Sequence, residues 1–330
     1  MEKKTKEQIF PLVSICCTTY NHAPFIRQCL DGFVMQKTSF SFEVLIHDDA
    51  STDGTQDIIQ EYAIRYPDII KPIYQTENQY SKGVKICLTY IYPRVKGKYI
   101  AICEGDDYWT DPNKLQKQVD FLENHPDYVM CSHRHNDYIQ EKGEMLYDTT
   151  ENETDYDLKS LIRGEWHFHP LTVMYRYNAL DLSNFKKYPT TMDVILFFEL
   201  LKKGGKGHCF SNVMAVYRHH AQGVWSEATL DRKRELEFKA RIGLYEVEHS
   251  DNAALFLLYQ FAKPISRKWM FQNKKMFSKV MTILLKHFGL FNVLRVLYIK
   301  IILDKLIPVS DSFENKMLNK NLDIHKCLHC

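Results

Sequence analysis

The chain has 330 residues, of which 45% are hydrophobic and 25% are charged. This length and composition are typical of a soluble globular protein with a sizeable core, built as one large domain with an appendage or as two modest domains. The net charge of +2 provides no general basic excess for neutralising phosphates, so we expect no nucleic acid partner.

The cysteines and the apolar runs bear on the cellular compartment. Nine cysteines are scattered without a regular framework, and Cys16, Cys17 and Cys103 lie inside apolar runs, a pattern typical of reduced, buried thiols. The first ten residues, MEKKTKEQIF, lack the apolar core of a signal peptide, and no run reaches the roughly 18 uninterrupted apolar residues of a membrane span. We therefore expect a cytoplasmic location.

The first half of the chain alternates between strand and helix patterns. Apolar runs predict strands over residues 12–17, 42–47, 70–74 and 99–103. Apolar residues at helical spacing predict helices over residues 25–34, 58–66 and 82–95. This alternation predicts an α/β fold with a mostly parallel sheet that is covered by helices on both faces.

Polar clusters follow three of these strands, at residues 18–21, 48–49 and 104–107. Ligands in parallel sheets bind outside the carboxyl ends of the strands, and all three clusters fall at that edge. Three polar clusters at one edge favour a functional site over three unrelated turns.

The third cluster contains Glu104, Asp106 and Asp107, with Gly105 allowing a tight turn. Carboxylates this close repel one another unless a cation lies between them, and Mg²⁺ or Mn²⁺ is the natural occupant. The alternative is a plain turn before a helix whose first residues are capped near Asp111 and Pro112.

Two nucleotide-binding motifs are missing from the sequence. No G-x-G-x-x-G follows the first strand, and no G-x-x-x-x-G-K-[ST] occurs anywhere. The sequence GGKG at residues 204–207 follows a helix and is expected to end it. A nucleotide would therefore be held by side chains and a metal ion rather than by a glycine-rich loop.

Five segments together resemble a known family. They are VSICCTTYNH, EVLIHDDASTDGT, KGKYIAICEGDDYWTDPNKLQKQVDFLENHPDY, MDVILFFEL and YRHHAQGVWS, which span roughly residues 11–226. In order and spacing the chain resembles the family 2 glycosyltransferases of the GT-A fold, inverting enzymes that build bacterial surface polysaccharides. The resemblance implies a GT-A type, Rossmann-like domain over residues 1–226 and a helical region over residues 227–330.

The resemblance implies that a sugar moves from a nucleotide diphosphate sugar, a UDP-sugar first of all, to a saccharide or lipid-linked saccharide. Thr18 and Tyr20 match the nucleobase end of the donor pocket, where Tyr20 would stack on or flank the uracil. Asp49 matches the acceptor for the N–H of the base ring, and Asp48 would support the loop. A turn at Tyr20 and a helix cap at Asp48 and Asp49 are the alternatives.

Glu104, Asp106 and Asp107 occupy the family's acidic metal and donor motif, although the family's usual first Asp is here Glu104, with a longer arm. Asp106 and Asp107 are the expected ligands of Mn²⁺ or Mg²⁺. His220 matches a histidine near the metal or the diphosphate, and Arg218 is expected at the same diphosphate oxygens. Simple surface exposure is the alternative for His220.

Asp193 matches the family's catalytic base, and a helix N-terminal acid favoured by the dipole is the alternative. For the acceptor, Trp109 is a candidate sugar platform, with a core position as its alternative. His167 and His169 are candidate acceptor residues.

Beyond residue 227 the resemblance fades. Residues 230–261 have helical patterns, and residues 265–307 combine apolar stripes with many lysines. Such helices either pack their apolar stripe on the rest of the protein or lie on the inner face of an anionic membrane. Two other functions remain open, a non-catalytic sugar-nucleotide or carbohydrate-binding protein on the same fold and a nucleotidyltransferase.

Overall fold

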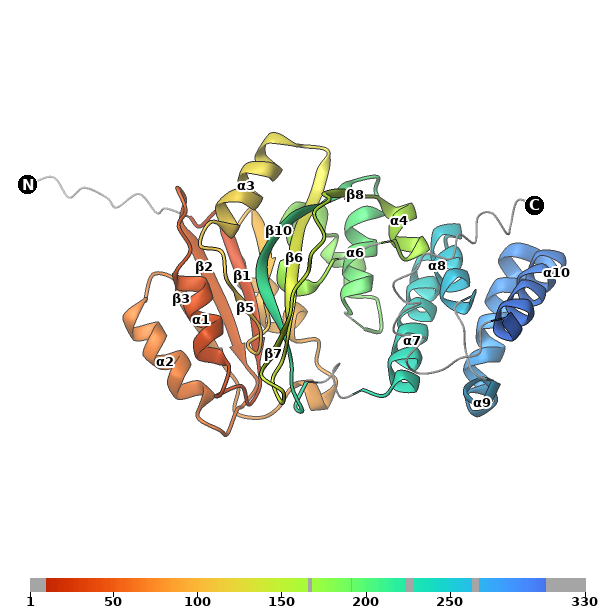
Figure 1. Cartoon of the computed structure of the whole chain (residues 1–330), viewed down its shortest axis with the longest axis horizontal. Coiled ribbons are helices and arrows are strands. Elements are labelled where there is room, and N and C mark those ends of the chain that lie inside the picture. The colour runs from red at the N-terminus through yellow and green to blue at the C-terminus, as the bar shows by residue number, and fades with distance from the viewer. Residues whose placement is uncertain (1–9, 166–167, 191, 224–227, 263–266, 307–330) are drawn as a thin grey trace, which may run out of the picture. The chain divides into compact units, whose positions relative to one another are not determined.

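The computed structural model describes residues 10–165, 168–190, 192–223, 228–262 and 267–306, and its strands form one mixed sheet (Figure 1). The strands are β1 (Val13–Thr19), β2 (Phe42–Asp48), β3 (Ile70–Tyr74), β4 (Tyr99–Ile102), β5 (Tyr108–Trp109), β6 (Tyr128–Ile139), β7 (Glu144–Leu146), β8 (Thr154–Tyr156), β9 (Met174–Arg176) and β10 (Lys206–His219). Their order is β3-β2-β1-β4-β9-β6-β10-β5, with β7 paired to β6 and β8 paired to β10.

The direction of the strands fixes one edge of the sheet as the site edge. Strands β3, β2, β1 and β4 are mutually parallel. Strand β9 is antiparallel to both β4 and β6, and β6 is parallel to β10. The carboxyl ends of β1, β2, β4, β6 and β10 therefore point the same way, as the expected GT-A type fold requires, and the fold prediction is confirmed.

Helices connect and cover these strands. The helices are α1 (Ile26–Val34), α2 (Thr55–Arg65), α3 (Lys114–Asn124), α4 (Leu158–Arg163), α5 (Leu182–Phe185), α6 (Asp193–Leu201), α7 (Leu230–Glu248), α8 (Asp251–Ala262), α9 (Arg267–Gln272) and α10 (Lys274–Leu306). The expected helix end at the GGKG segment is confirmed, because α6 ends at Leu201 and Gly204 adopts a positive φ of 92°.

The helix predicted between residues 82 and 95 is confirmed in part. The range contains no α-helix but three short helical segments, the 3₁₀ helix η1 (Tyr80–Lys82), the π-helix η2 (Cys87–Ile91) and the 3₁₀ helix η3 (Tyr92–Arg94). Pro93 has no N–H to donate and therefore cannot continue an α-helical hydrogen-bond pattern, and Gly83 ends η1 with a left-handed φ of 77°. Apolar spacing alone did not reveal these two interruptions.

The core lies between the sheet and the helices of its first half. In α1, Ile26, Cys29, Leu30 and Phe33 follow helical spacing and are all fully buried. A Cβ at Gly32 would lie 2.9 Å from the Trp109 carbonyl oxygen, so glycine lets α1 approach the backbone of β5 directly. All seven cysteines that the structure describes are free, six of them buried, as the apolar runs predicted.

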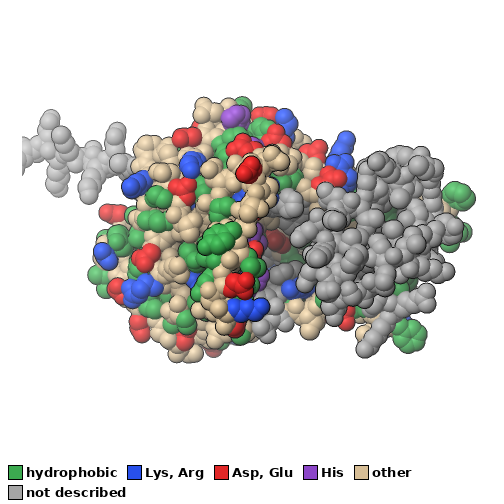
Figure 2. Space-filling view, in the orientation of Figure 1, with side chains coloured by type: hydrophobic (Ala, Val, Ile, Leu, Met, Phe, Trp, Pro, Cys, Tyr) green, Lys and Arg blue, Asp and Glu red, His purple; other side chains and the backbone are tan. Residues whose placement is uncertain are grey.

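The chain divides into two compact units. The first comprises Met1–Asp157, His167–Lys186 and Leu196–Glu227, and the second comprises Leu158–Trp166, Lys187–Ile195 and Ala228–Cys330. The second unit thus begins its main segment near the expected boundary at residue 226 and also takes two earlier segments. Within it α8 packs against α4, α7 and α10. On the face shown in Figure 2, acidic and basic side chains of the first unit are interspersed.

Lys114 is a fully buried cation in the core of the first unit. Its Nζ donates a hydrogen bond to Gln118 Oε1 at 2.7 Å and lies 3.8 Å from the centre of the Trp109 ring. Burial lowers the pKa of Lys114 from 10.5 to about 7. The charged form therefore costs more in the folded protein than in the unfolded chain.

This pKa predicts a pH dependence of stability. Between pH 7 and 10.5 the unfolded chain binds the Lys114 proton more strongly than the folded protein, so stability should rise with pH. Relative to Lys114→Met, the wild-type free energy of unfolding should gain about 1 kcal/mol per pH unit from pH 7 to about 8.5. Urea unfolding at several pH values measures this gain. Lys117→Met, an exposed position on the same helix, should follow the wild type, and a parallel wild-type and Lys114→Met profile would contradict the assignment.

Candidate active site

Backbone hydrogen bonds bring the three polar clusters together at the carboxyl edge of the sheet. The Asp49 N–H donates to the Thr19 carbonyl at 3.0 Å, and the Gly105 N–H donates to the Thr18 carbonyl at 2.9 Å. The loops after β2 and β4 are thus both bonded to the end of β1. The expectation that the three clusters meet is confirmed.

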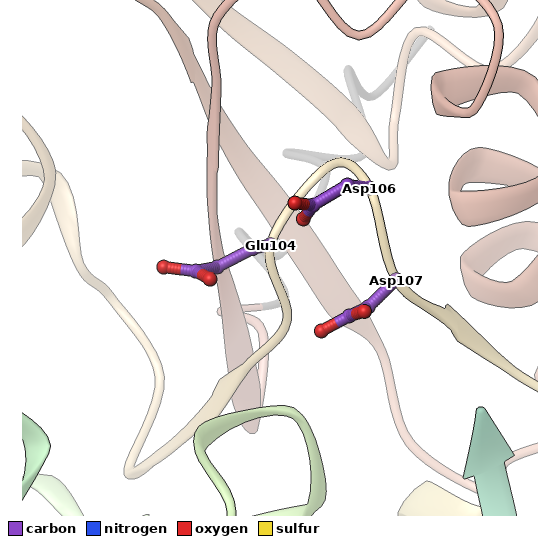
Figure 3. A group of neighbouring side chains, drawn as sticks. All are labelled: Glu104, Asp106 and Asp107. Atoms are coloured by element: carbon purple, nitrogen blue, oxygen red, sulfur yellow. The ribbon is translucent and has the colours of Figure 1, made fainter. Parts of the chain in front are cut away.

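The loop after β4 presents three carboxylates to one side (Figure 3). Glu104, Asp106 and Asp107 each offer an oxygen within 4.8 Å of the others, with Glu104 exposed and Asp107 buried. The turn requires Gly105, because a Cβ there would lie 2.7 Å from both Cβ and Oγ1 of Thr19. Glycine at position 105 therefore allows the close contact with Thr19 that the turn carrying the three acids requires.

The charges of this loop are unfavourable without a cation. Burial, together with the neighbouring charge of Asp106, raises the pKa of Asp107 well above its usual range. Burial also opposes ionisation of Asp106, but the hydrogen bond from His220 and the charge of His22 outweigh it and lower the pKa of Asp106. Asp106 Oδ1 is buried and has no hydrogen-bond partner among the described residues. A hard divalent cation fits this set of oxygens.

Two histidines contact the same carboxylate. His220 Nε2 lies 3.0 Å from Asp106 Oδ2, and the Gln222 N–H donates to His220 Nδ1 at 3.3 Å. These two bonds favour the tautomer in which Nε2–H of His220 donates to Asp106. His220 is buried, so the surface alternative for it is wrong. His220 is not one of the three residues grouped closely enough to share a metal ion, so its role as a metal ligand stays a prediction.

His22 is a site residue that the sequence analysis missed. Its Nε2 lies 3.8 Å from Asp106 Oδ2, and its ring packs edge-on against His220 with the ring centres 6.1 Å apart. Burial lowers the pKa of His22. Its position in the sequence, two residues beyond Tyr20 in the turn that ends β1, could have indicated that it belongs to the site.

Arg218 supports the acidic loop through hydrogen bonds to Asp106 and Asp107. Its backbone N–H donates to Asp107 Oδ1 at 2.8 Å, and its Nε donates to the Asp106 carbonyl at 2.9 Å. Its terminal nitrogens donate to Gln28 and Gln140 at 2.6 and 2.5 Å. The guanidinium also lies 4.9–5.5 Å from the ring centres of Phe25, Tyr108 and Tyr138. These contacts make Arg218 a support of the loop, and the predicted diphosphate contact stays a prediction.

The predicted nucleobase residues lie at the ends of β1 and β2. Tyr20 is 45% exposed, and Thr18 is partly buried. Asp49 is buried, and its two carboxylate oxygens accept the backbone N–H groups of Gln79 and Tyr80 at 2.8 and 2.9 Å. Asp49 therefore holds the start of η1 in place, and its predicted bond to the base would use a remaining lone pair.

Asp48 supports its loop, as the resemblance implied. It is fully buried and accepts hydrogen bonds from the N–H and Oγ of Ser51 and from Gln56 Nε2. The start of α2 is capped by other means, because Asp53 accepts from the N–H and Oγ1 of Thr55. The helix-cap alternative for Asp48 and Asp49 therefore does not describe their main contacts.

The predictions for the three acceptor residues differ in outcome. The prediction of Trp109 as an exposed sugar platform is wrong, because the residue is 2% exposed and its Nε1–H donates to the Leu171 carbonyl at 2.9 Å. Its ring packs against Phe33 in the core, as the alternative held. His167 lies outside the described residues.

His169 belongs to a partly exposed aromatic cluster next to the carboxyl ends of β6 and β10. Its ring centre lies 5.0 Å from that of His135 and 4.4 Å from that of Tyr217. Burial, with a further contribution from His135, lowers the pKa of His169 well below its usual range, so its ring is neutral at pH 7. Its acceptor role stays a prediction, and His135 and Tyr217 are its neighbours there.

Asp193 is the first residue of α6 and lies in the second unit. The residue is partly buried, and its Oδ1 accepts the Val194 N–H at 2.8 Å. Burial raises the pKa of Asp193, an effect that the hydrogen bond from Val194 partly offsets. A carboxylate with a raised pKa suits a general base, but the position also suits a helix N-terminal acid.

The chain is similar to known proteins in both sequence and fold. A family model described as "Glycosyl transferase family 2" matches residues 14–221. An uncharacterized protein of Mycobacterium bovis, Mb1547, is 37% identical over 226 residues, which are 67% of this chain and 63% of that protein. The chain thus spans less than two thirds of the length of that relative.

Two further similarities carry functional names. The putative teichuronic acid biosynthesis glycosyltransferase TuaG of Bacillus subtilis is 29% identical over 214 residues, covering 63% of this chain and 79% of TuaG. The crystal structure of S. aureus TarS 1-349 in complex with UDP has a TM-score of 0.58 at 15% identity, covering 82% of this chain and 80% of that one. At this identity the structural match supports the shared fold alone.

Proposed function

Because the chain belongs to glycosyltransferase family 2, and is therefore a glycosyltransferase, we propose that it is inverting and metal-dependent and uses a nucleotide diphosphate sugar, a UDP-sugar first of all. The acceptor in this proposal is a saccharide or lipid-linked saccharide of polysaccharide biosynthesis. The observation that carries the proposal is the buried Asp106 Oδ1, which has no hydrogen-bond partner in the described part of the chain and belongs to a group of three carboxylates at the ligand-binding edge of the sheet.

The acidic loop would hold the donor diphosphate through a cation. Asp106 and Asp107 would hold Mn²⁺ or Mg²⁺, with the exposed Glu104 reaching the metal or the ribose. When bound, the metal would act as a Lewis acid that stabilises negative charge on the departing diphosphate. His220 orients Asp106 by its hydrogen bond, and Arg218 fixes the backbone of the loop. These contacts prevent the crowded carboxylates from moving apart.

The nucleobase would lie over the ends of β1 and β2. The exposed ring of Tyr20 offers a stacking surface for uracil, and Asp49 offers an acceptor for its ring N–H. Asp48 holds the loop that carries Asp49. Uracil presents such a ring N–H beside two carbonyl groups, which supports UDP over nucleotides whose bases present a different pattern.

A single base completes an inverting displacement. The acceptor hydroxyl must lose its proton as it attacks the anomeric carbon, and Asp193 is the proposed base. Its raised pKa increases its proton affinity, which suits a group that accepts the proton of the acceptor hydroxyl. One displacement with one base inverts the anomeric centre, and no second carboxylate acts as a nucleophile, in contrast to retaining hydrolases.

The two rival functions make different demands on the chain. A nucleotidyltransferase would need a basic, glycine-rich triphosphate loop after β1, where this chain has the sequence TTYNH. A non-catalytic binding protein would not need an acid such as Asp193. We also propose that the enzyme acts in the cytoplasm, at the inner face of the membrane where lipid-linked acceptors are accessible.

Calorimetry with UDP, GDP, CDP and TDP tests the donor site. We expect UDP to bind most tightly in the presence of Mn²⁺, and EDTA to weaken that binding at least about tenfold, because metal bridges to the diphosphate would be lost. A matched titration with uridine should depend little on the metal. Absence of binding by all four nucleotides to folded protein would contradict the proposed donor site.

A further inference from the structure

Helix α10 carries apolar side chains on two different faces. The helix is interrupted at Gly289, whose φ of 73° and ψ of 166° separate one helical segment before it from another after it. In the first segment Val280, Ile283 and Leu284 are buried, and α10 packs on α8 in the same unit. This face accounts for the apolar stripe that we expected to pack within the protein.

A second apolar surface remains exposed in the part of the chain that the structure describes. Leu290, Phe291 and Leu294 are 64%, 82% and 53% exposed, although Val293 between them is buried. We call these three residues the exposed stripe. Phe271 and Leu285 are also exposed in α9 and α10, and Figure 2 shows hydrophobic side chains where Figure 1 draws these helices. Single exposed apolar residues are common, but several that lie close together indicate an interaction surface.

The charge of the same segment is strongly one-sided. Residues 267–306, which span α9 and α10, contain nine of the 43 Lys and Arg residues of the chain and one of its 41 Asp and Glu residues, Asp304. The remainder of the chain therefore has more acidic than basic residues. Lys274, Lys275 and Lys286 are exposed, and within the described residues they make no ion pair. An anionic surface would attract this end of the chain and repel the rest.

We propose that α9 and α10 dock on the surface of an anionic lipid bilayer, with the exposed stripe among the acyl chains and the three lysines at the phosphates. Apolar residues combined with a large excess of basic over acidic residues are typical of helices that lie in the membrane interface. A membrane would be a further partner of the proposed transferase. Only the biological purpose of this contact rests on the proposed function. The surface itself is independent of the donor site.

The geometry favours lying on the membrane over crossing it. Lys274–Leu294 is long and apolar enough to pass as a membrane span by length and composition alone. However, Gly289 interrupts that stretch, and Lys279 and Lys286 fall inside it. The segment before Gly289 is shorter than the roughly 20 residues that a straight span needs.

Vesicle flotation of the full chain tests the proposal. Vesicles of phosphatidylcholine with roughly 30 mol% phosphatidylglycerol should carry the protein to the top of the gradient, whereas pure phosphatidylcholine should carry at least about tenfold less. Raising the salt concentration should weaken the binding. The triple variant Leu290→Ser, Phe291→Ser, Leu294→Ser should bind at least about tenfold more weakly. So should the triple variant Lys274→Gln, Lys275→Gln, Lys286→Gln.

Control variants distinguish binding by this surface from nonspecific hydrophobic binding and from effects on the donor site. Ile64→Ser and Tyr147→Ser remove equally exposed apolar side chains from the first unit and should leave flotation unchanged. Asp106→Asn should also float normally, so a failed donor site and a failed membrane surface give different results. UDP binding by each surface variant confirms that it is folded.

Three results would overturn the proposal. Equal binding to both kinds of vesicle, or none to either, would exclude an anionic bilayer as the partner. A concentration-dependent dimer that the Leu290, Phe291 and Leu294 substitutions dissociate, without vesicle binding, would assign the surface to a second copy of the chain. Protein from membranes that resists extraction by alkaline carbonate would indicate a spanning helix.

Discussion

Asp107→Asn should abolish metal-dependent sugar transfer and at the same time stabilise the metal-free protein. Asparagine keeps an Oδ1 that can accept the Arg218 N–H, as Asp107 Oδ1 does at 2.8 Å, so the loop should keep its shape. The substitution removes one of the negative charges that the proposed cation needs. We expect turnover to fall by about 10³-fold, the upper end of the roughly 10²- to 10³-fold loss that follows removal of one electrostatic contact to the developing charge.

The opposite effect on stability follows from the raised pKa of Asp107. Because the folded pKa lies above the unfolded one, the folded protein holds this proton more strongly, and stability is lost as the pH rises through the usual range towards the folded pKa. At neutral pH the buried Asp107 carboxyl group therefore destabilises the metal-free wild type relative to a neutral side chain of the same shape, and asparagine removes that penalty. The melting temperature in EDTA should rise in the variant.

Thermal unfolding with and without Mn²⁺ measures both effects together. The wild type should be stabilised by Mn²⁺ with UDP and the variant should not, since only the wild type would bind the pair. Asp68→Asn changes an exposed acid two residues before β3 and serves as the control, which should respond to Mn²⁺ like the wild type. If Asp107→Asn still bound UDP in a metal-dependent way, the metal site would have to be placed elsewhere.

The sheet could be predicted because its signals are local. The expected strand over residues 70–74 coincides with β3, and the strands over 12–17 and 42–47 differ from β1 and β2 by one or two residues at their ends. Buried parallel strands are continuous apolar runs, and each is followed by a polar loop. The same rule placed Thr18, Asp49 and the acidic loop at one edge, which the backbone bonds between these loops confirm.

The contacts within the site could not be predicted in the same way. Arg218 follows the acidic loop by more than 100 residues, and the pairing of β10 with β5 brings its backbone to Asp107. His22 was overlooked because a histidine in a turn has no pattern of its own. Trp109 resembled a sugar platform, since its burial depends on α1 and the carbonyl of Leu171, which are distant in sequence.

Asp193→Asn should reduce turnover by about 10³-fold, within the range expected for the loss of a general base, while leaving UDP binding nearly unchanged. The asparagine Oδ1 can still accept the Val194 N–H, so the start of α6 should be preserved. A base must be deprotonated to act, and burial raises the pKa of Asp193, so wild-type turnover should fall as the pH drops through that raised pKa. The residual activity of the variant should lack this acidic limb.

Asp251→Asn is the matched control, because Asp251 is likewise the first residue of a helix in the second unit. If Asp193 only stabilises the dipole of α6, both substitutions should cost a similar amount of stability, roughly 0.3–1 kcal/mol, and leave turnover intact. If UDP binding and transfer fell together in Asp193→Asn, the residue would support the donor site rather than accept the proton. Loss of turnover alone, with the pH profile changed and the melting temperature kept, is the result that only a base predicts.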